Sequence, residues 1–437
     1  MKPDAREVAL RVLTARERPS RAFSYDVLQD PRDRALALEL VNGTIRWRRL
    51  LSSYVSVFSD RPLRTLDPTL RNALLLGAFQ LLVLGTAPHA AVDSMVRCLK
   101  GKGERAYCNA CLRSISRNLG HLELPDVRED PIAYMAERYS YPDWIPSYFA
   151  ERAGIPWAMA MCRSGNTAPS VSLRVNTAKT DVKDLLERFR QEGYDVMGGR
   201  LPVSLRVRRG RSVTEFPGYR EGLFSVQDEG AMVISLALGP EKGDSVWDVC
   251  AAPGGKTTHL AELVGPEGRV LATDIDAERA SMIEENVRRM GQSNVEIRVL
   301  DATAGVPEGT FDAVLVDAPC SGLGVLNRNP DLRWNRRRSD INVMAQRQKV
   351  LLDKASSRVR AGGVLVYSTC TLTFEENEMV WTAFLKEHPM FSPEDPARCP
   401  GGHLMVEDER FQGPGYRYLL PDRSGTDGFF VAKARRL

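Results

Sequence analysis

The residues from Cys250 to Lys256 form the first segment of the chain whose side chains and spacing could do chemistry. They follow the apolar run SVWDVC and lead into a helical pattern as Cys250, Ala251, Ala252, Pro253, Gly254, Gly255 and Lys256. A glycine turn between a strand and a helix lets backbone N–H groups approach an anion closely. Three anions could use such a loop: the phosphates of a nucleotide, the pyrophosphate of a dinucleotide, or the carboxylate of S-adenosylmethionine.

The glycine spacing separates these three ligands. A nucleoside triphosphatase loop needs glycine five residues before Gly255, where this chain has Cys250. A dinucleotide fold needs the pattern G-x-G-x-x-G, which the loop lacks. The loop therefore predicts an S-adenosylmethionine site, in which it holds the methionine carboxylate.

Two aspartates end the next two apolar runs. Asp274 lies 19 residues after Gly255, where a carboxylate can accept hydrogen bonds from both ribose hydroxyls, and Asp301 lies where a carboxylate can meet the adenine amino group. Aspartate also caps helices at such turns. Its recurrence at successive strand ends favours a ligand site.

Two cysteines follow the fourth and fifth runs, at Cys320 and Cys370. Because parallel strands end at one edge of a sheet, both thiols should face one pocket. A thiolate beside a methyl donor can activate a carbon that is not nucleophilic: sulfur adds to C6 of a pyrimidine, and C5 then attacks the methyl group. The C5 proton must leave and the sulfur be eliminated, and the donor's sulfonium or Lys256 would favour the thiolate. The residues themselves leave open which cysteine attacks.

The elements that must position these residues alternate regularly from residue 231 onward. Helical patterns at 257–263, 277–290 and 341–359 separate the apolar runs SVWDVC, RVLATDID, VEIRVLD, FDAVLVDAP and GVLVYSTC. Such alternation predicts a parallel sheet with helices on both faces, that is, a Rossmann-like α/β domain at 231–437. The glutamines and arginine at 346–348 lie on the last of these helices, and we expect them at the surface.

The preceding residues predict two further domains. The first 120 residues show only helical periodicity, with helices expected at 4–15, 31–59, 68–84, 89–99 and 105–118. The acidic stretch 125–130 marks a boundary, which gives an all-α domain at 1–130. Residues 131–230 contain strand patterns at 171–177, 204–210 and 223–228 and a helix at 181–192. They predict a small α+β module of the RRM or ferredoxin-like kind.

Composition restricts the class of protein further. The chain is 43% hydrophobic and 27% charged, which excludes a mainly disordered protein. No secretory signal is apparent, and the uncharged stretch 72–92 is too interrupted to span a bilayer, so we expect a buried helix there and a cytoplasmic protein with reduced thiols. Cys108 and Cys111 form a C-x-x-C without a second pair at zinc spacing. We expect a monomer without metal or membrane partners.

Arginine clusters suggest a nucleic-acid partner, although the net charge of +4 alone does not. Residues 200–211 hold five arginines and no acid, and residues 328–338 hold five with Asp331 and Trp334 among them. A charge run is usually a solvated surface, but two arginine-rich clusters favour phosphate contact. The candidate RNA-binding residues are Arg206, Arg208, Arg209, Arg328, Arg333 and Arg336.

Several ordered motifs resemble those of the NOL/NOP/Sun RNA cytosine-C5 methyltransferases. They are DVCAAPGGKTTHLAE, TDID, LDAT, DAPCSGLGVLNRNPDLRW, LVYSTCTLTFEENE and the terminal DGFFVAK. The helical front part, with RDRALALELVNGTIRWRRLL, LGAFQLLVLGTAPHAAV and YCNACLRSISRN, is similar to the NusB-like domain of the bacterial Sun-type members. The resemblance thus covers essentially the whole chain.

The resemblance implies a role for each motif. Cys250 to Lys256, Asp274, Asp301 and Asp317 would line the S-adenosylmethionine site, and Asp317 would also belong to the catalytic site. There Cys370 would be the nucleophile and Cys320 would assist release of the adduct. The implied substrate is small-subunit (16S) ribosomal RNA. The alternatives are a transfer RNA substrate and a non-catalytic NusB-type RNA-binding factor, which would need neither cysteine.

Overall fold

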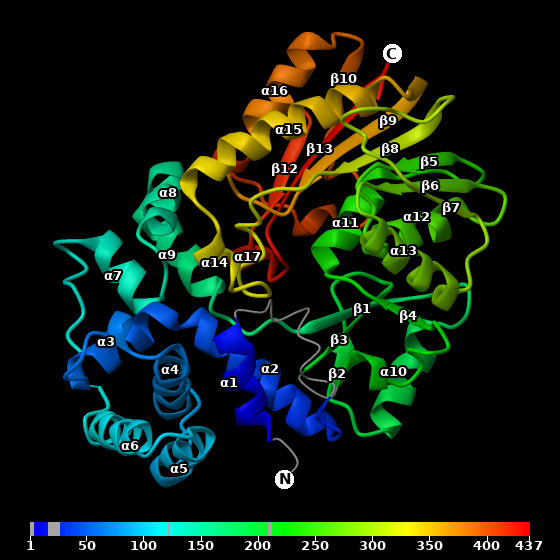
Figure 1. The fold of residues 1–437 in the computed structure, drawn as a ribbon. Helices are drawn as coiled ribbons and strands as arrows, with labels where there is room; N and C mark the ends of the chain where they lie inside the picture. Colours follow the sequence, from blue (N-terminus) through cyan, green and yellow to red (C-terminus); the bar gives the residue numbers. More distant parts are fainter. Residues whose placement is uncertain (1–3, 16–26, 121, 209–211) are drawn as a thin grey trace. The chain divides into compact units, whose positions relative to one another are not determined.

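The computed structural model describes residues 4–15, 27–120, 122–208 and 212–437. They form two compact units (Figure 1). The first comprises Met1–Thr167 and Asn329–Asn335, and the second comprises Ala168–Arg328 and Arg336–Leu437. A seven-residue piece from the second half of the sequence therefore belongs to the first unit.

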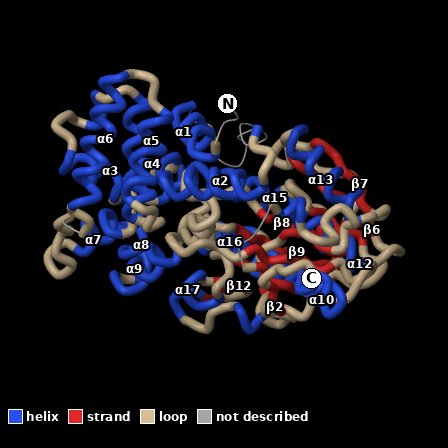
Figure 2. Tube along the Cα trace, turned by 90° about the horizontal axis from the view of Figure 1, so that it is seen from below, coloured by secondary structure: helices blue, strands red, loops and turns tan. Residues whose placement is uncertain are grey.

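The described part of the first unit consists of helices and loops, and the strands, red in Figure 2, all belong to the second unit. Its helices are α1 (Ala5–Ala15), α2 (Pro31–Arg46), α3 (Arg48–Phe58), α4 (Pro68–Leu82), α5 (Pro88–Cys98), α6 (Lys102–Arg117), α7 (Pro131–Arg138), α8 (Trp144–Ala153), α9 (Ile155–Ser164) and α14 (Leu332–Asn335). Three of them begin with an Asp-Pro pair, in which the aspartate caps the helix and proline takes the first helical position.

Helix α4 is the centre of this bundle. It packs against α1, α2, α3, α5 and α6, and its residues from Ala73 to Leu81 are all buried. The buried helix predicted for the long uncharged stretch is confirmed. No helix in the described residues is long and apolar enough to cross a membrane.

The helix predicted at 31–59 is two helices, and this prediction is corrected. The break falls at Trp47, where no proline or glycine stands. Just beyond it the Arg49 N–H donates to Ser140 Oγ at 2.9 Å, and the Arg49 guanidinium bonds to Glu137 and Asp143. These partners lie about 90 residues away in sequence, so a tertiary contact, which periodicity cannot reveal, accompanies the break.

Arg333 lies inside this unit, which corrects its assignment as an RNA-binding residue. Its side chain is fully buried, and its guanidinium donates to the carbonyl oxygens of Gly165 at 2.6 Å and Arg46 at 3.2 Å and to Asn166 Oδ1 at 2.8 Å. It also lies 3.9 Å from the centroid of the Tyr141 ring. Arg333 therefore presents no charge to solvent. Residues 131–167, which the sequence analysis placed in the second domain, form helices of this first unit; the three domain boundaries stay predictions.

The second unit contains a small four-stranded antiparallel sheet in the order β2-β3-β1-β4. Its elements are β1 (Val171–Val175), α10 (Val182–Gln191), β2 (Val196–Gly198), β3 (Ser204–Val207) and β4 (Phe224–Val226). Phe189 of α10 packs edge-on against Phe216 and Phe224, with ring centroids 5.6 and 5.9 Å apart. The predicted α+β module is confirmed.

A nine-stranded sheet forms the rest of this unit, in the order β11-β12-β13-β9-β8-β5-β6-β7, with β10 paired to β13. Its strands are β5 (Ser245–Asp248), β6 (Arg269–Asp274), β7 (Val295–Val299), β8 (Phe311–Asp317), β9 (Val359–Thr369), β10 (Phe391–Pro393), β11 (Gln412–Gly413), β12 (Tyr416–Leu419) and β13 (Phe429–Arg436). Its helices are α11 (Glu229–Leu238), α12 (Gly255–Val264), α13 (Ala277–Met290), α15 (Arg338–Ser356), α16 (Glu378–Glu387) and α17 (Pro421–Ser424). Helices α11 to α13 cover one face, and α15 and α16 cover the other (Figure 1).

The parallel pairing predicted for the five apolar runs is confirmed, but the complete sheet is mixed. Strands β5 to β9 pair in parallel, but β13 runs antiparallel to β9, and β10 and β12 run antiparallel to β13. Strand direction depends on the route of the preceding connection, which a local pattern does not contain. The five parallel strands are those that carry the predicted site residues.

A buried arginine joins the two sheets of this unit. Arg174 on β1 is fully buried, donates to Gln227 Oε1 at 2.7 Å and Thr258 Oγ1 at 2.8 Å, and forms an ion pair with Glu262 of α12. The α+β module is therefore held against the helix that follows the Cys250 loop.

We predict that Arg333→Met destabilises the first unit by about 3 kcal/mol, because several buried carbonyl oxygens lose their donor. Hydrogen exchange measured by mass spectrometry should show faster exchange in α7 to α9. Arg337→Met is the matched control, since Arg337 is exposed, and it should change exchange little. Equal protection in both variants would contradict this role for Arg333.

Candidate active site

The predicted loop joins β5 to the N-terminus of α12. Gly254 has φ of +100°, and a Cβ there would lie 3.2 Å from the Cα of Ile283, so both conformation and space require glycine. The turn opens α12 at Gly255, and the first N–H groups of a helix have no partner within the helix. The loop thus provides the kind of anion site that the sequence predicted.

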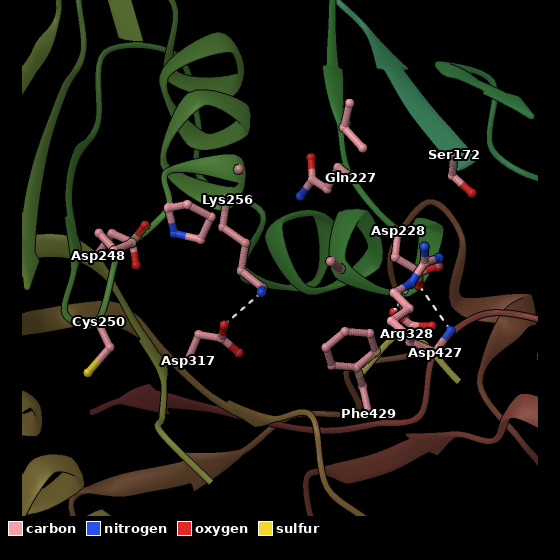
Figure 3. Close-up of a pocket in the computed structure, with 16 residues that line it drawn as sticks. Ser172, Gln227, Asp228, Asp248, Cys250, Lys256, Asp317, Arg328, Asp427 and Phe429 are labelled. Carbon is pink, nitrogen blue, oxygen red and sulfur yellow. Dashed lines mark hydrogen bonds and ion pairs between the residues drawn. The ribbon is translucent and has the colours of Figure 1, made fainter. Parts of the chain in front are cut away.

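A cavity of about 380 Å³ lies beside this loop (Figure 3). Residues of the loop, of both sheets and of the turn before β13 line it. They are Ser172, Val226, Gln227, Asp228, Ala231, Asp248, Cys250, Ala251, Ala252, Pro253, Gly255, Lys256, Asp317, Arg328, Asp427 and Phe429. The loop residues predicted for the cofactor therefore line one cavity, apart from Gly254.

Lys256 and Asp317 point toward one another in this cavity (Figure 3). Lys256 Nζ lies 2.7 Å from Asp317 Oδ2, and Asp317 Oδ1 accepts from Ser368 Oγ at 2.7 Å. Burial disfavours the ammonium, but Asp317 and Asp248 outweigh burial and hold the pKa of Lys256 above its ordinary value. Lys256 therefore carries a positive charge at the ends of β8 and β9.

Asp248 has an unused hydrogen-bonding atom. Its Oδ2 accepts from Thr257 Oγ1 at 2.7 Å, whereas Oδ1 is buried and has no partner among the described residues. Burial, together with the charges of Asp317 and Asp274, raises the pKa of Asp248 to about 7. Gln227 Nε2 is likewise buried and without a partner. Both side chains line the cavity, which leaves an acceptor and a donor available to a ligand.

The two predicted cysteines are brought together. Cys320 Sγ and Cys370 Sγ lie 3.3 Å apart, although 50 residues separate them in sequence. Cys320 is buried and Cys370 is partly exposed. The hydrogen bond to Cys370, and burial, hold the pKa of the Cys320 thiol well above its ordinary value. Cys320 therefore keeps its proton and can donate to the sulfur of Cys370.

A buried carboxylate that the sequence analysis missed holds the two cysteine loops. Glu376 Oε1 accepts from the Ser321 N–H at 2.8 Å and from Gln348 Nε2 at 3.0 Å, and Oε2 accepts from Thr373 Oγ1 at 2.7 Å. Ser321 follows Cys320 directly, and its hydroxyl also lies 2.7 Å from Thr371 Oγ1, beside Cys370. The cluster of polar residues after Cys370 was the feature of the sequence from which a buried network around Glu376 could have been predicted. Gln348, expected at the surface, is fully buried, and that expectation is corrected.

Backbone contacts tie the turn before β13 to the same loops. The Gly324 N–H donates to the Cys370 carbonyl at 3.0 Å, and the Gly428 N–H donates to the Gly324 carbonyl at 2.8 Å. A Cβ at Gly324 would lie 2.2 Å from the Gly428 oxygen. Glycine is therefore required where the loop after Cys320 meets the terminal DGFFVAK motif.

Most of the arginines expected to contact RNA have partners within the protein. Arg206 pairs with the fully buried Glu229, and Arg328 bridges Asp228 and Asp427 at 2.9 and 2.6 Å. Arg336 donates to the carbonyl oxygens of Ser321 and Cys320 at 3.2 and 3.4 Å. Arg208 is exposed, and Arg209 lies outside the described residues. Of the described members of this set, only Arg208 remains an exposed candidate for phosphate.

Comparison with known proteins shows that three successive parts of the chain match three protein families. Residues 3–117 match the NusB family, residues 141–214 match a ferredoxin-like domain of RsmF/B-like methyltransferases, and residues 235–435 match the 16S rRNA methyltransferase RsmB/F family. The chain is 33% identical over 452 residues to the Probable ribosomal RNA small subunit methyltransferase B of Bacillus subtilis (strain 168), a match that covers 100% of this chain and 99% of that protein. The chain belongs to the ribosomal RNA small subunit methyltransferase B family.

Two further similarities agree with this family. The Ribosomal RNA small subunit methyltransferase B of Vibrio vulnificus (strain YJ016) is 33% identical over 92% of this chain and 91% of its own. The crystal structure of PH0851 superposes with a TM-score of 0.81 at 26% identity and covers 98% of this chain and 99% of that one. The predicted fold class, a NusB-like helical domain, a ferredoxin-like module and a methyltransferase domain, is confirmed.

In this member of the small subunit methyltransferase B family, the two predicted strand-end aspartates lie outside the described cavity lining. Asp274 is buried, accepts from the Ala252 N–H at 3.2 Å and lies 3.5 Å from the Arg279 guanidinium, so it supports the loop. Asp301 accepts from the Thr303 hydroxyl and N–H, and these bonds lower its pKa. Their assignment to the nucleoside part of the cofactor stays a prediction.

We predict that Glu376→Gln lowers the stability of the second unit by about 1.5 to 3 kcal/mol, the scale for hydrogen bonds to a charged group. The turnover number for methyl transfer should fall as well, because Ser321 and the Cys320 loop lose their anchor. Cofactor affinity should stay unchanged, since Glu376 does not line the cavity.

Thermal unfolding, turnover and cofactor calorimetry together check this expectation. Glu387→Gln, the same change at an exposed site near the end of α16, is the control. Full turnover in the Glu376 variant would show that the network does not position the cysteines.

Proposed function

We propose that this protein transfers the methyl group of S-adenosylmethionine to C5 of a cytosine in small-subunit ribosomal RNA, through a covalent bond between a cysteine and C6. The observation that carries the proposal is the thiol pair, 3.3 Å apart, whose two members interact electrostatically with Lys256 and Asp317 in the lining of the cavity at the Cys250 loop. The relatives named small subunit methyltransferase B support the RNA substrate. A cytoplasmic location and a monomeric state stay predictions.

S-adenosylmethionine is the methyl donor, and the cavity fits it. The donor carries an ammonium group, a carboxylate and a sulfonium. Asp248 Oδ1 can accept from the ammonium, and Gln227 Nε2 or the N-terminus of α12 can donate to the carboxylate. When bound, the donor supplies an electrophilic methyl group. The acidic side chains of Asp248 and Asp317 suit its positive charges.

Cys370 is the attacking sulfur in this mechanism. It is the more exposed thiol, and the buried Cys320 retains a proton that it can donate to the Cys370 sulfur. Lys256, which carries a positive charge, interacts electrostatically with Cys370. Asp317 holds Lys256 in place. The Cys370 sulfur forms a bond to C6, and the electron pair of the C5–C6 double bond makes C5 a nucleophile for the methyl group.

Cys320 acts after methyl transfer. Once Cys370 is bound to C6, its sulfur no longer carries the negative charge that opposes ionisation of Cys320, so the pKa of Cys320 falls. Cys320 can then lose its proton to solvent and take the proton from C5. The C5–H electron pair restores the C5–C6 double bond, the C6–S bond breaks, and Cys370 leaves as a thiolate. A factor that only binds RNA would need neither thiol.

We predict that donor affinity depends on the ionisation of Asp248. The carboxylate, but not the acid, can accept from an ammonium, and burial places its pKa at about 7. Affinity should therefore rise about tenfold between pH 6 and pH 8. In Asp248→Asn it should be about tenfold weaker at pH 8 and lose most of this dependence.

Isothermal calorimetry with S-adenosylmethionine checks this dependence. Asp244→Asn is a matched control, because Asp244 lies four residues earlier and does not line the cavity. An identical pH profile in the Asp248 variant would remove this carboxylate from the ammonium site.

We predict that the two cysteine variants fail in different ways. Cys370→Ala cannot form the C6 adduct, so methyl transfer should fall to background. Cys320→Ala should still attack but release product slowly, so protein covalently bound to RNA should accumulate as a slow band on a denaturing gel. Exchange of these phenotypes would reverse the two roles, and full turnover in both variants would refute the thiolate mechanism.

A further inference from the structure

A second cavity, of about 600 Å³, lies wholly within the helical first unit. Helices α1 to α4 line it together with the piece at 329–335. Its volume falls in the range of small-molecule and nucleotide sites, roughly 300 to 1,000 Å³. The methyl-transfer mechanism does not use it.

An indole with a fixed orientation forms part of this cavity. Trp334 Nε1 donates to the Ile45 carbonyl at 2.8 Å, and the ring is only partly buried. The guanidinium of Arg48 lies 5.8 Å from the ring centroid. Because the N–H is already bonded, the ring offers its apolar surface to a ligand. The hydrogen bond also fixes the ring before binding, so little side-chain entropy is lost when a ligand binds.

The lining contains a second arginine. Arg71 is half-buried on α4, and its side chain makes no hydrogen bond or ion pair with any described residue. Arg71 is not one of the arginines that the sequence analysis assigned to RNA. Arg71 and Arg48 thus give the cavity two guanidinium groups against the single carboxylate of Asp331. This balance favours an anionic ligand.

Uncharged polar groups complete the lining. Thr44 is 3% exposed, and its Oγ1 is buried without a hydrogen-bond partner. The Asn72 amide, bonded to Thr14 only at 3.4 Å, and the Asn335 amide lie in the same lining. A buried hydroxyl without a partner costs stability unless a ligand or water satisfies it.

We propose that this cavity binds one unpaired nucleotide of an RNA, with its base against Trp334, its base edge at Thr44 and Asn72, and its phosphate at Arg71 and Arg48. Aromatic stacking combined with arginine is how proteins hold single-stranded RNA. A base in a double helix is paired and stacked, and it can enter a cavity only after it has been flipped out, which costs free energy. An apolar ligand would leave the guanidinium group of Arg71 without a counter-charge. The inference rests on the proposed function in that RNA is taken as the substrate.

Fluorescence anisotropy with a short, unstructured, labelled RNA tests the site in the full chain without the methyl donor. Arg71→Ala should weaken binding about fivefold or more and reduce the slope of log affinity against log salt by about one. Trp334→Leu should weaken binding about fivefold or more, whereas Trp334→Phe should keep most of the affinity. Affinity for a fully paired RNA duplex should not change in any variant.

Matched controls separate this site from general charge effects. Arg64→Ala removes an exposed arginine of the same unit, and Trp144→Leu repeats the tryptophan change on α8; both should bind RNA as the parent does. The Arg71 side chain makes no hydrogen bond or ion pair with any described residue, so its variant should melt close to the parental temperature. Parental affinity and salt slope in both Arg71→Ala and Trp334→Leu would overturn the proposal.

The test is independent of catalysis. A protein that loses RNA affinity in these variants but never methylates RNA would refute the proposed function and leave the cavity assignment standing. A protein that methylates RNA normally while both variants bind as the parent does would refute the cavity assignment alone. In methylation assays the Arg71 variant should raise KM for RNA and leave kcat unchanged.

Discussion

The buried carboxylate of Glu376 sets the geometry on which the proposed chemistry depends. Cys320 and Cys370 follow different strands, and a separation of 3.3 Å between two sulfurs tolerates little movement of either loop. The parallel strands β8 and β9 bring both loops to one edge of the sheet, but strand pairing alone does not fix loops beyond the strand ends. Glu376 does so by accepting hydrogen bonds from both loops and from Gln348, at a depth where an unmade bond is costly.

Several arginines of this protein bind acceptor groups in its interior and not only at its surface. Arg174 and Arg333 are fully buried, and Arg206 and Arg328 pair with buried carboxylates. The guanidinium fork can satisfy several acceptors at once, which offsets the cost of removing its charge from water. An arginine cluster in a sequence therefore indicates that hydrogen-bond acceptors lie close to those side chains in the folded protein or its complex. Only the fold decides whether those acceptors are phosphates or the protein's own carbonyl and carboxylate groups.

The two cavities have opposite chemistry. The cavity at the Cys250 loop has four aspartates against Lys256 and Arg328 and suits a ligand with positive groups. The cavity in the helical unit has two arginines against one aspartate, together with an indole, and suits an anion with an aromatic ring. The chain connects them directly, since Trp334 follows Cys320 by 14 residues. The segment that leaves the cysteine loop thus goes on to build part of the first unit.

The sequence by itself determined the features that depend on neighbours along the chain: the Cys250 loop, the five parallel strands, the two cysteines at adjacent strand ends and the helical front part. Periodicity and turn chemistry are local, so they can be read locally. Only the tertiary structure decided the antiparallel β13, the break at Trp47, and the burial of Gln348 and Arg333. Each depends on partners brought from elsewhere in the chain, as when Arg333 meets Gly165, 168 residues away. No local pattern encodes such a partner.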